Sequence, residues 1–135
     1  METTVVLIKP DGVAMGFTES IINRYVEAGL RVLCRGTYRM TADQAKQFYA
    51  EHEGRFYFAA LILAMTSGPI EMLFLEAEYA VQLVRSMTGA TDPSKAAQGT
   101  IRHDFRSAGG PFNTVHASDS LASAEREHNL IANWR

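Results

Sequence analysis

The amino-acid sequence predicts a small α/β sandwich, a β-sheet covered by helices. The chain has 135 residues, close to the usual size of one domain, and 47% of them are hydrophobic, enough to form one core. Short runs of β-branched and apolar residues alternate with segments whose apolar residues follow helical spacing. We therefore expect a single domain over residues 1–135, while these patterns leave parallel and antiparallel strand pairing open.

The first part of the chain predicts two strands separated by a helix. β-Branched residues at 3–8 predict a strand, and the turn-forming residues 9–12 end it. A capping signal at 18–20 precedes apolar residues at helical spacing, and Ala28-Gly29 ends this helix. A second strand, apolar in its first half, is expected over residues 30–40.

The middle of the chain predicts helices on both sides of a third strand. A capping signal at the start of residues 41–49 indicates a short helix, and an aromatic group leads into a second helix over residues 56–65. Residues 67–69 break the chain. A strand over 70–75 and a helix over 78–87 follow.

The last part of the chain predicts a long loop, a strand and a helix. Periodicity is lost over residues 88–112, where only the short stretch 100–102 could pair as a strand. A loop of this length inside a compact domain is typically functional. Residues 113–116 then predict a fourth strand, and a cap at 118–120 begins a helix that runs to about His128.

The net charge and the cysteine content exclude several classes of protein. A formal charge of −2 argues against a nucleic-acid-binding surface, which normally carries a basic footprint. The single Cys34 cannot form an internal disulfide, and the apolar run near the start is too short for a signal peptide or a membrane span. We therefore expect a cytoplasmic protein that binds no membrane and no nucleic acid.

Phosphate chemistry in this chain would have to use side chains. The sequence has no glycine-rich phosphate loop of the G-x-x-x-x-G-K-[ST] or G-x-G-x-x-G type. Arginine and lysine can instead hold phosphate oxygens and stabilise charge during phosphoryl transfer. A solvated surface charge is the commoner explanation of any such residue taken singly. The candidate cations are Lys9, Arg55, Arg85 and Arg102.

His116 is the candidate nucleophile. It lies between an expected strand and an expected helix start, where the helix dipole favours phosphate. A neutral imidazole is a competent nucleophile near pH 7, because the unperturbed pKa of a histidine side chain is about 6.5. The simpler alternative is a histidine that only satisfies a backbone group. Ser118 and Glu127 also have ordinary explanations, as part of a helix cap and as a solvated helix carboxylate. None of the histidines has the spacing of a metal site.

Five motifs in this order resemble the nucleoside diphosphate kinase family over nearly the whole chain. Each motif alone is weak, but their order and near-family spacing are specific, and together they favour the catalytic interpretation of His116. The motifs are I-K-P-D-G at 8–12, S-G-P at 67–69, G-A-T-D-P at 89–93, G-T-I-R at 99–102 and N-T-V-H-A-S-D-S at 113–120.

The resemblance implies a fold and a reaction. The fold is a ferredoxin-like α/β sandwich with a four-stranded antiparallel sheet covered by helices. The reaction is a reversible ping-pong transfer of the γ-phosphate of a nucleoside triphosphate, typically ATP, to a nucleoside diphosphate through a phosphohistidine at His116. Mg²⁺ is implied as a cofactor that the nucleotide phosphates carry, with no protein metal site. A homo-oligomer, either a hexamer or a tetramer built from dimers, is also implied.

The resemblance also assigns roles by position. Glu127 matches the carboxylate that orients the His116 ring, and Ser118 matches the hydroxyl that contacts this carboxylate. Tyr57 falls where the family usually has a phenylalanine stacked on the base, and stacking with little base-edge readout would tolerate any nucleobase. The side chains that match those around the phosphates and sugar are Lys9, Tyr49, Arg85, Thr91, Arg102 and Asn113.

The chain departs from the family pattern at a few positions. Ala117 replaces a usual glycine, which is tolerable only if the backbone has no positive φ there. His103 replaces another glycine, Met15 replaces an arginine, and residues 106–112 are one residue longer than typical. The alternative function is a regulatory or nucleotide-binding protein that keeps this fold without activity.

Overall fold

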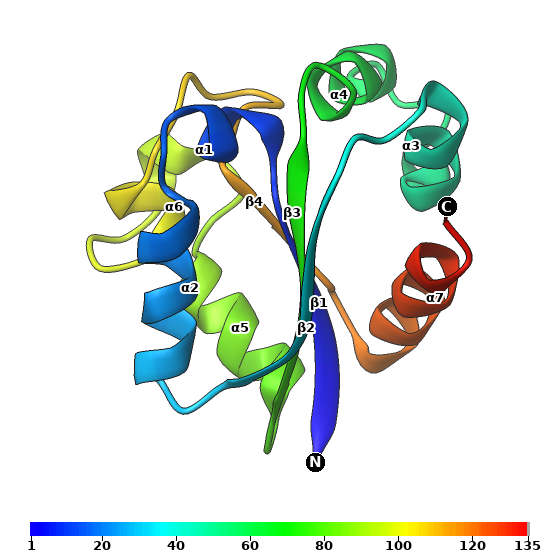
Figure 1. Cartoon of the computed structure of the whole chain (residues 1–135). Coiled ribbons are helices and arrows are strands. Elements are labelled where there is room, and N and C mark those ends of the chain that lie inside the picture. The colour runs from blue at the N-terminus through cyan, green and yellow to red at the C-terminus, as the bar shows by residue number, and fades with distance from the viewer. Residues whose placement is uncertain (135) are drawn as a thin grey trace.

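The computed structural model describes residues 1–134 and contains a four-stranded sheet with helices on both faces (Figure 1). The strands lie in the order β2-β3-β1-β4, and every neighbouring pair is antiparallel. The antiparallel ferredoxin-like sandwich is therefore confirmed, and parallel pairing is excluded. The strands are β1 (Glu2–Ile8), β2 (Arg31–Tyr38), β3 (Ile70–Ala77) and β4 (Val115–Ala117).

The helices form two layers. Helices α1, α2, α5 and α6 lie on one side of the sheet in Figure 1, and α3, α4 and α7 lie on the other. The helices are α1 (Pro10–Ala14), α2 (Thr18–Glu27), α3 (Ala42–Phe48), α4 (Phe58–Met65), α5 (Ala80–Thr88), α6 (Ile101–Asp104) and α7 (Leu121–Ala132), with the 3₁₀ turns η1 (Ala50–His52) and η2 (Pro93–Lys95).

The central strand β1 separates two hydrophobic clusters. Its side chains alternate between the faces of the sheet, as a period of two requires. Val5 and Leu7 belong to the cluster that includes residues of α3, α4 and α7, whereas Val6 and Ile8 belong to the cluster that includes residues of α2 and α5. The position of a side chain on the sheet therefore decides which helical layer it meets.

Two sequence expectations near the N-terminus were wrong in detail. The turn expected at residues 9–12 is the start of helix α1, because Pro10 occupies the first helical position, where a missing N–H costs nothing. The expected cap at 18–20 is absent, since α2 begins at Thr18 and its N-cap residue is Phe17, with no side-chain capping bond. Lys9 consequently stands directly between strand β1 and helix α1.

Two expectations for the last third of the chain, at residues 100–102 and at residue 113, were also wrong. The stretch 100–102 does not pair as a strand but begins α6, which places Arg102 on a helix. The fourth strand does not begin at residue 113, because Thr114 has a φ of 77°, outside the strand region. Strand β4 therefore starts at Val115, and His116 is its middle residue.

The capping signals of two other helices were confirmed. Thr41 forms a capping box with Gln44 at the start of α3. Ser120 accepts a hydrogen bond from the amide of Ser123 and is the N-cap of α7. Helix α7 runs to Ala132, beyond the expected end near His128, and this additional turn buries Ile131 in the core.

Candidate active site

The direction of the His116 side chain follows from strand β4. Val115 and Ala117 pack in the cluster shared with α2 and α5. Because strand side chains alternate, His116 points to the opposite face, toward α3 and α7. Its neighbour across the strand pair is Leu7, which belongs to that face. The ring is 18% exposed, so one side remains open to a ligand.

A buried carboxylate holds the His116 ring. Nε2 of His116 lies 2.8 Å from Oε1 of Glu127, and Glu127 is only 1% exposed. The Ser118 hydroxyl donates to the same carboxylate oxygen over 2.8 Å and also contacts the backbone of Val5 in β1. Since charged groups are rarely buried without partners, these contacts account for the buried position of Glu127.

Lys9 connects two loops through Asn113. The Lys9 Nζ donates to Oδ1 of Asn113 over 2.8 Å, and Nδ2 of Asn113 donates to the carbonyl of Thr91 over 3.0 Å. Burial lowers the pKa of Lys9 to about 8, the charge of Asp11 raises it in part, and the charge of Arg102 lowers it further. Lys9 is therefore a buried cation with a neutral partner.

Arg102 and Arg85 come from the helices on the other side of the sheet. Nη2 of Arg102 donates to the carbonyl of Val115, the residue before His116, over 2.8 Å. Its Nε is buried and has no partner among the described residues. Burial and then the charge of Arg85 lower the pKa of Arg102. Arg85 pairs with Asp119 over 2.9 Å at a more exposed position.

Two aromatic rings of α3 and its C-terminal end pack against His116. The ring centroid of Phe48 lies 4.9 Å from that of His116, and the Tyr49 centroid lies 5.6 Å away, both nearly edge-on. The Tyr49 hydroxyl is buried and has no partner in the part of the chain that the structure describes. Burial and the charge of Glu127 raise the pKa of Tyr49. An unpaired buried hydroxyl beside His116 can serve a ligand.

Tyr57 comes from the connection between η1 and α4. It precedes α4 and is half-buried against the α3 and α4 cluster. Its hydroxyl lies 2.6 Å from Nδ1 of His52. Arg55, also considered as a phosphate ligand, is exposed and makes no side-chain hydrogen bond within residues 1–134.

Sequence reasoning missed the residues that fix the backbone before His116. Asp11 accepts the amide of Thr114 over 2.9 Å, and the Thr114 hydroxyl donates to the carbonyl of Phe105 over 2.6 Å. Gly12 lies so close to Thr114 that an added Cβ would be 3.0 Å from its carbonyl oxygen. Asp11 and Gly12 lie in the I-K-P-D-G motif, but the positive φ of Thr114 gives no sequence signal.

Comparison with known proteins places this geometry in a family. The model of the family described as nucleoside diphosphate kinase matches residues 2–133. The chain belongs to the nucleoside diphosphate kinase family. The nucleoside diphosphate kinase of Psychromonas ingrahamii is 47% identical over 94% of this chain and 88% of its own length, and that of Staphylothermus marinus is 46% identical over 96% and 92%.

Solved structures of the family share the fold. The nucleoside diphosphate kinase of Aquifex aeolicus has a TM-score of 0.92 at 34% identity and covers 96% of this chain and 94% of its own. That of Encephalitozoon cuniculi has a TM-score of 0.93 at 29% identity, with 96% and 88% covered. The protein is thus a phosphotransferase acting on nucleotides, and the catalytically inactive alternative is disfavoured.

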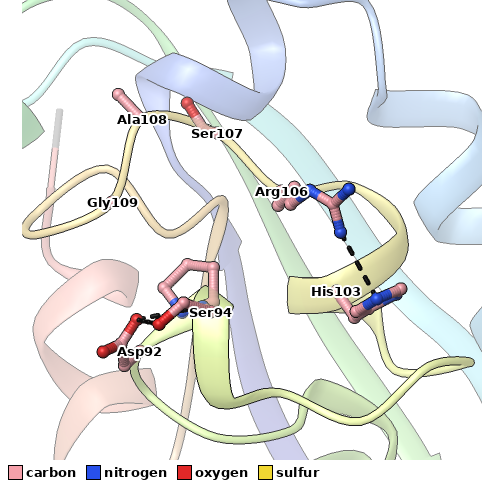
Figure 2. Close-up of a pocket in the computed structure, with 8 residues that line it drawn as sticks. Asp92, Ser94, His103, Arg106, Ser107, Ala108 and Gly109 are labelled. Carbon is pink, nitrogen blue, oxygen red and sulfur yellow. Dashed lines mark hydrogen bonds between the residues drawn. The ribbon is translucent and has the colours of Figure 1, made fainter.

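The structure locates each departure from the nucleoside diphosphate kinase pattern. Ala117 lies in strand β4 with no positive φ, so its methyl group is accommodated in the core. His103 faces Arg106, with Nε2 3.3 Å from Nη1, beside a pocket of about 420 Å³ (Figure 2). That pocket is lined by residues 92–94 at η2, by His103 and by residues 106–109. Met15 ends helix α1 at an exposed position.

Two further observations concern metals and membranes. Within residues 1–134, no group of three or more His, Cys, Asp or Glu side chains is arranged to hold a metal ion. None of the helices that the structure describes combines the length and the hydrophobicity needed to cross a bilayer.

Proposed function

We propose that His116 carries the phosphate between nucleotides. The observation behind this proposal is the bond between Nε2 of His116 and the buried Glu127 carboxylate. A carboxylate accepts hydrogen bonds, so Nε2 carries the ring proton and Nδ1 keeps its lone pair. Nδ1 makes no hydrogen bond within residues 1–134 and is the nitrogen available for attack.

The transfer then occurs in two steps. Nδ1 attacks the γ-phosphorus of a nucleoside triphosphate, an N–P bond forms, and the bond to the bridging oxygen breaks as the diphosphate leaves. The positive charge that develops on the ring is stabilised by Glu127, whose position Ser118 fixes. A second nucleoside diphosphate attacks the phosphohistidine from the same position, so the reaction is reversible.

Cationic side chains stabilise the phosphate oxygens. Positive charge comes from Lys9 between β1 and α1, from Arg85 on α5 and from Arg102 on α6. The unsatisfied Nε of Arg102 and the unpaired hydroxyl of Tyr49 are buried polar groups that a phosphate would satisfy. A preorganised arrangement of this kind favours the charge distribution of the transition state.

The nucleoside occupies the outer part of the site in this proposal. Thr91 and Asn113 contact the phosphates and sugar, and their loops are already joined by the bond from Asn113 to the Thr91 carbonyl. Tyr57 offers a half-buried ring face to the base. Stacking on a ring face tolerates different bases, which suits an enzyme that accepts several nucleoside diphosphates.

Mg²⁺ is part of the proposal as an ion carried by the nucleotide. The protein side of the site is rich in cations, and its most buried carboxylate, Glu127, is engaged by His116 and Ser118. This donor set fits a metal held by phosphate oxygens and water. The ion would neutralise charge on the β- and γ-phosphates.

Domain number, cellular location and oligomeric state are also part of the proposal. We expect one domain over residues 1–135, a cytoplasmic location, and a homo-oligomer, either a hexamer or a tetramer built from dimers. Strand β2 supports an oligomer, because it is an edge strand with Leu33 42% exposed. Light scattering would measure the oligomeric state directly.

An exchange assay tests the proposed function. The protein is incubated with Mg²⁺, radiolabelled ATP and, in turn, each of several nucleoside diphosphates. We expect label in every corresponding triphosphate, and initial rates that follow ping-pong kinetics. Label transfer that requires both nucleotides to be bound at once would contradict a phosphohistidine intermediate.

A further inference from the structure

His52 connects the residues around the nucleophile to Tyr57. Its ring centroid lies 6.0 Å from that of Tyr49, which also packs against His116, and 5.6 Å from that of Tyr57. Nδ1 of His52 and the Tyr57 hydroxyl are 2.6 Å apart, a short hydrogen bond. His52 ends the turn η1, and Tyr57 is the N-cap residue of α4, so the bond spans the connection between two elements.

The direction of this hydrogen bond follows from the other side of the ring. Nε2 of His52 faces Oε1 of Glu51 at 4.0 Å. A negative oxygen favours a proton on Nε2, which leaves Nδ1 of a neutral ring as the acceptor. The Tyr57 hydroxyl then donates its only proton to His52. That proton is no longer available to a nucleotide.

Tyr57 has few other restraints. It is partly exposed, and its ring packs on the α3 and α4 cluster on one side and against Phe56 at 5.4 Å. Phe56 is itself 99% exposed and provides little support. The hydrogen bond to His52 is the only polar contact of the Tyr57 side chain within residues 1–134. The orientation of the ring therefore depends on His52.

We propose that His52 is a positioning residue for nucleobase binding: it fixes the Tyr57 ring and occupies the Tyr57 hydroxyl, so that the base meets only a ring face. This inference rests on the proposed function, in which Tyr57 stacks on the base. It adds a specificity role for His52, because a free hydroxyl beside the base would favour bases with a matching hydrogen-bonding edge. The short bond suppresses this preference.

Four variants separate orientation from base selection. His52→Leu frees the hydroxyl and the ring, Tyr57→Phe removes the hydroxyl but also frees the ring, and the double variant combines both. His52→Asn is the conservative control, because its side-chain amide offers an oxygen close to the position of Nδ1. For each protein, KM and kcat are measured with four nucleoside diphosphates that differ in base.

We expect KM to rise about 3- to 10-fold in His52→Leu and in Tyr57→Phe, as the loss of one hydrogen bond predicts. The double variant should be no worse than either, since both changes remove the same bond. His52→Asn should stay close to wild type. Only in His52→Leu should the kcat/KM values for the four nucleoside diphosphates differ more from one another than they do in wild type. Labelling of His116 by phosphoramidate, a donor without a base, should keep its wild-type rate.

Three results would overturn the inference. The first is a wild-type KM in His52→Leu, and the second is a range of kcat/KM among the bases that widens equally in Tyr57→Phe. The third is labelling by phosphoramidate that slows by the same factor as labelling by ATP, which would mean that His52 acts on His116 through Tyr49. A wild-type protein that takes no phosphate from ATP would instead overturn the proposed function, and the inference with it.

Discussion

Nε2 of His116 and Oε1 of Glu127 lie 2.8 Å apart, and this bond joins the short edge strand β4 to helix α7. The carboxylate is buried, and the ring that it holds is partly open. One nitrogen of the imidazole is therefore committed to the protein, and the other remains for a ligand. The proposed chemistry depends on this division.

Replacement of Glu127 should lower turnover with little loss of nucleotide binding. In Glu127→Gln the charge that stabilises the developing imidazolium is lost, so we expect kcat to fall on the order of 100-fold while KM changes little. Glu125→Gln is the matched control, because Glu125 is exposed on the same helix. Steady-state exchange kinetics measure both. Equal kcat values for the two variants would rule out the role of Glu127.

Lys9 should make stability depend on pH. Its pKa is about 8 in the folded chain against an ordinary 10.5. Below pH 8 Lys9 is protonated in both the folded and the unfolded chain, and burial of its charge lowers the free energy of unfolding by its full amount, on the order of 3 kcal/mol. Between pH 8 and 10.5 the unfolded chain binds more protons, so stability rises with pH.

Denaturant unfolding of Lys9→Met tests this dependence. We expect the variant to be more stable than wild type near pH 7 but inactive, and the difference in unfolding free energy to shrink between pH 8 and 10.5. Lys46→Met, at an exposed position on α3, should follow the wild-type profile. Parallel profiles for wild type and Lys9→Met would show that Lys9 is not a strained buried cation.

Arg102 should contribute to the transition state. Arg102→Ala removes a buried guanidinium beside the carbonyl of Val115. By analogy with the loss of one preorganised donor, we expect kcat/KM to fall on the order of 100-fold, a loss of about 3 kcal/mol of transition-state stabilisation. Arg31→Ala, at a well-exposed arginine on β2, is the control. A similar kcat/KM in both variants would remove Arg102 from the phosphate site.

Gly12 should not tolerate a methyl group. Alanine usually stabilises a helix relative to glycine, but here the added Cβ would lie 3.0 Å from the side chain and the carbonyl of Thr114 and 3.1 Å from Ile8. We expect Gly12→Ala to destabilise the fold by about 1–3 kcal/mol. Gly68→Ala, with its nearest contact at 3.6 Å, should be near neutral in chemical denaturation. A stabilised Gly12→Ala variant would contradict the close approach.

Local patterns predicted most of the fold, because the buried strands and the amphipathic helices follow simple periods. The pairing direction came only from the resemblance, since a single sequence does not show which strands are neighbours. The errors lie where local signals compete: Pro10 ends a strand and also begins a helix. Residues 100–102 looked extended, but form the first turn of α6.

The site was predictable only in part. His116 was a candidate from its position, and the resemblance decided its role and that of Glu127. Their contact requires the His116 side chain to point toward α7, and this direction depends on which residue begins strand β4. The positive φ of Thr114 sets this start. The bond between His52 and Tyr57 was not predicted, because a histidine and a tyrosine five residues apart give no local signal of a contact.

Phosphate labelling tests whether His116 carries the phosphate. Wild type and His116→Ala are incubated with Mg²⁺ and ATP labelled at the γ-phosphate, and the protein-bound label is then treated with acid and with alkali. We predict that the wild-type label is lost in acid and kept in alkali, as expected for a phosphohistidine, and that His116→Ala takes up no label. Equal labelling of His116→Ala, or a label that is stable in acid, would contradict the central claim.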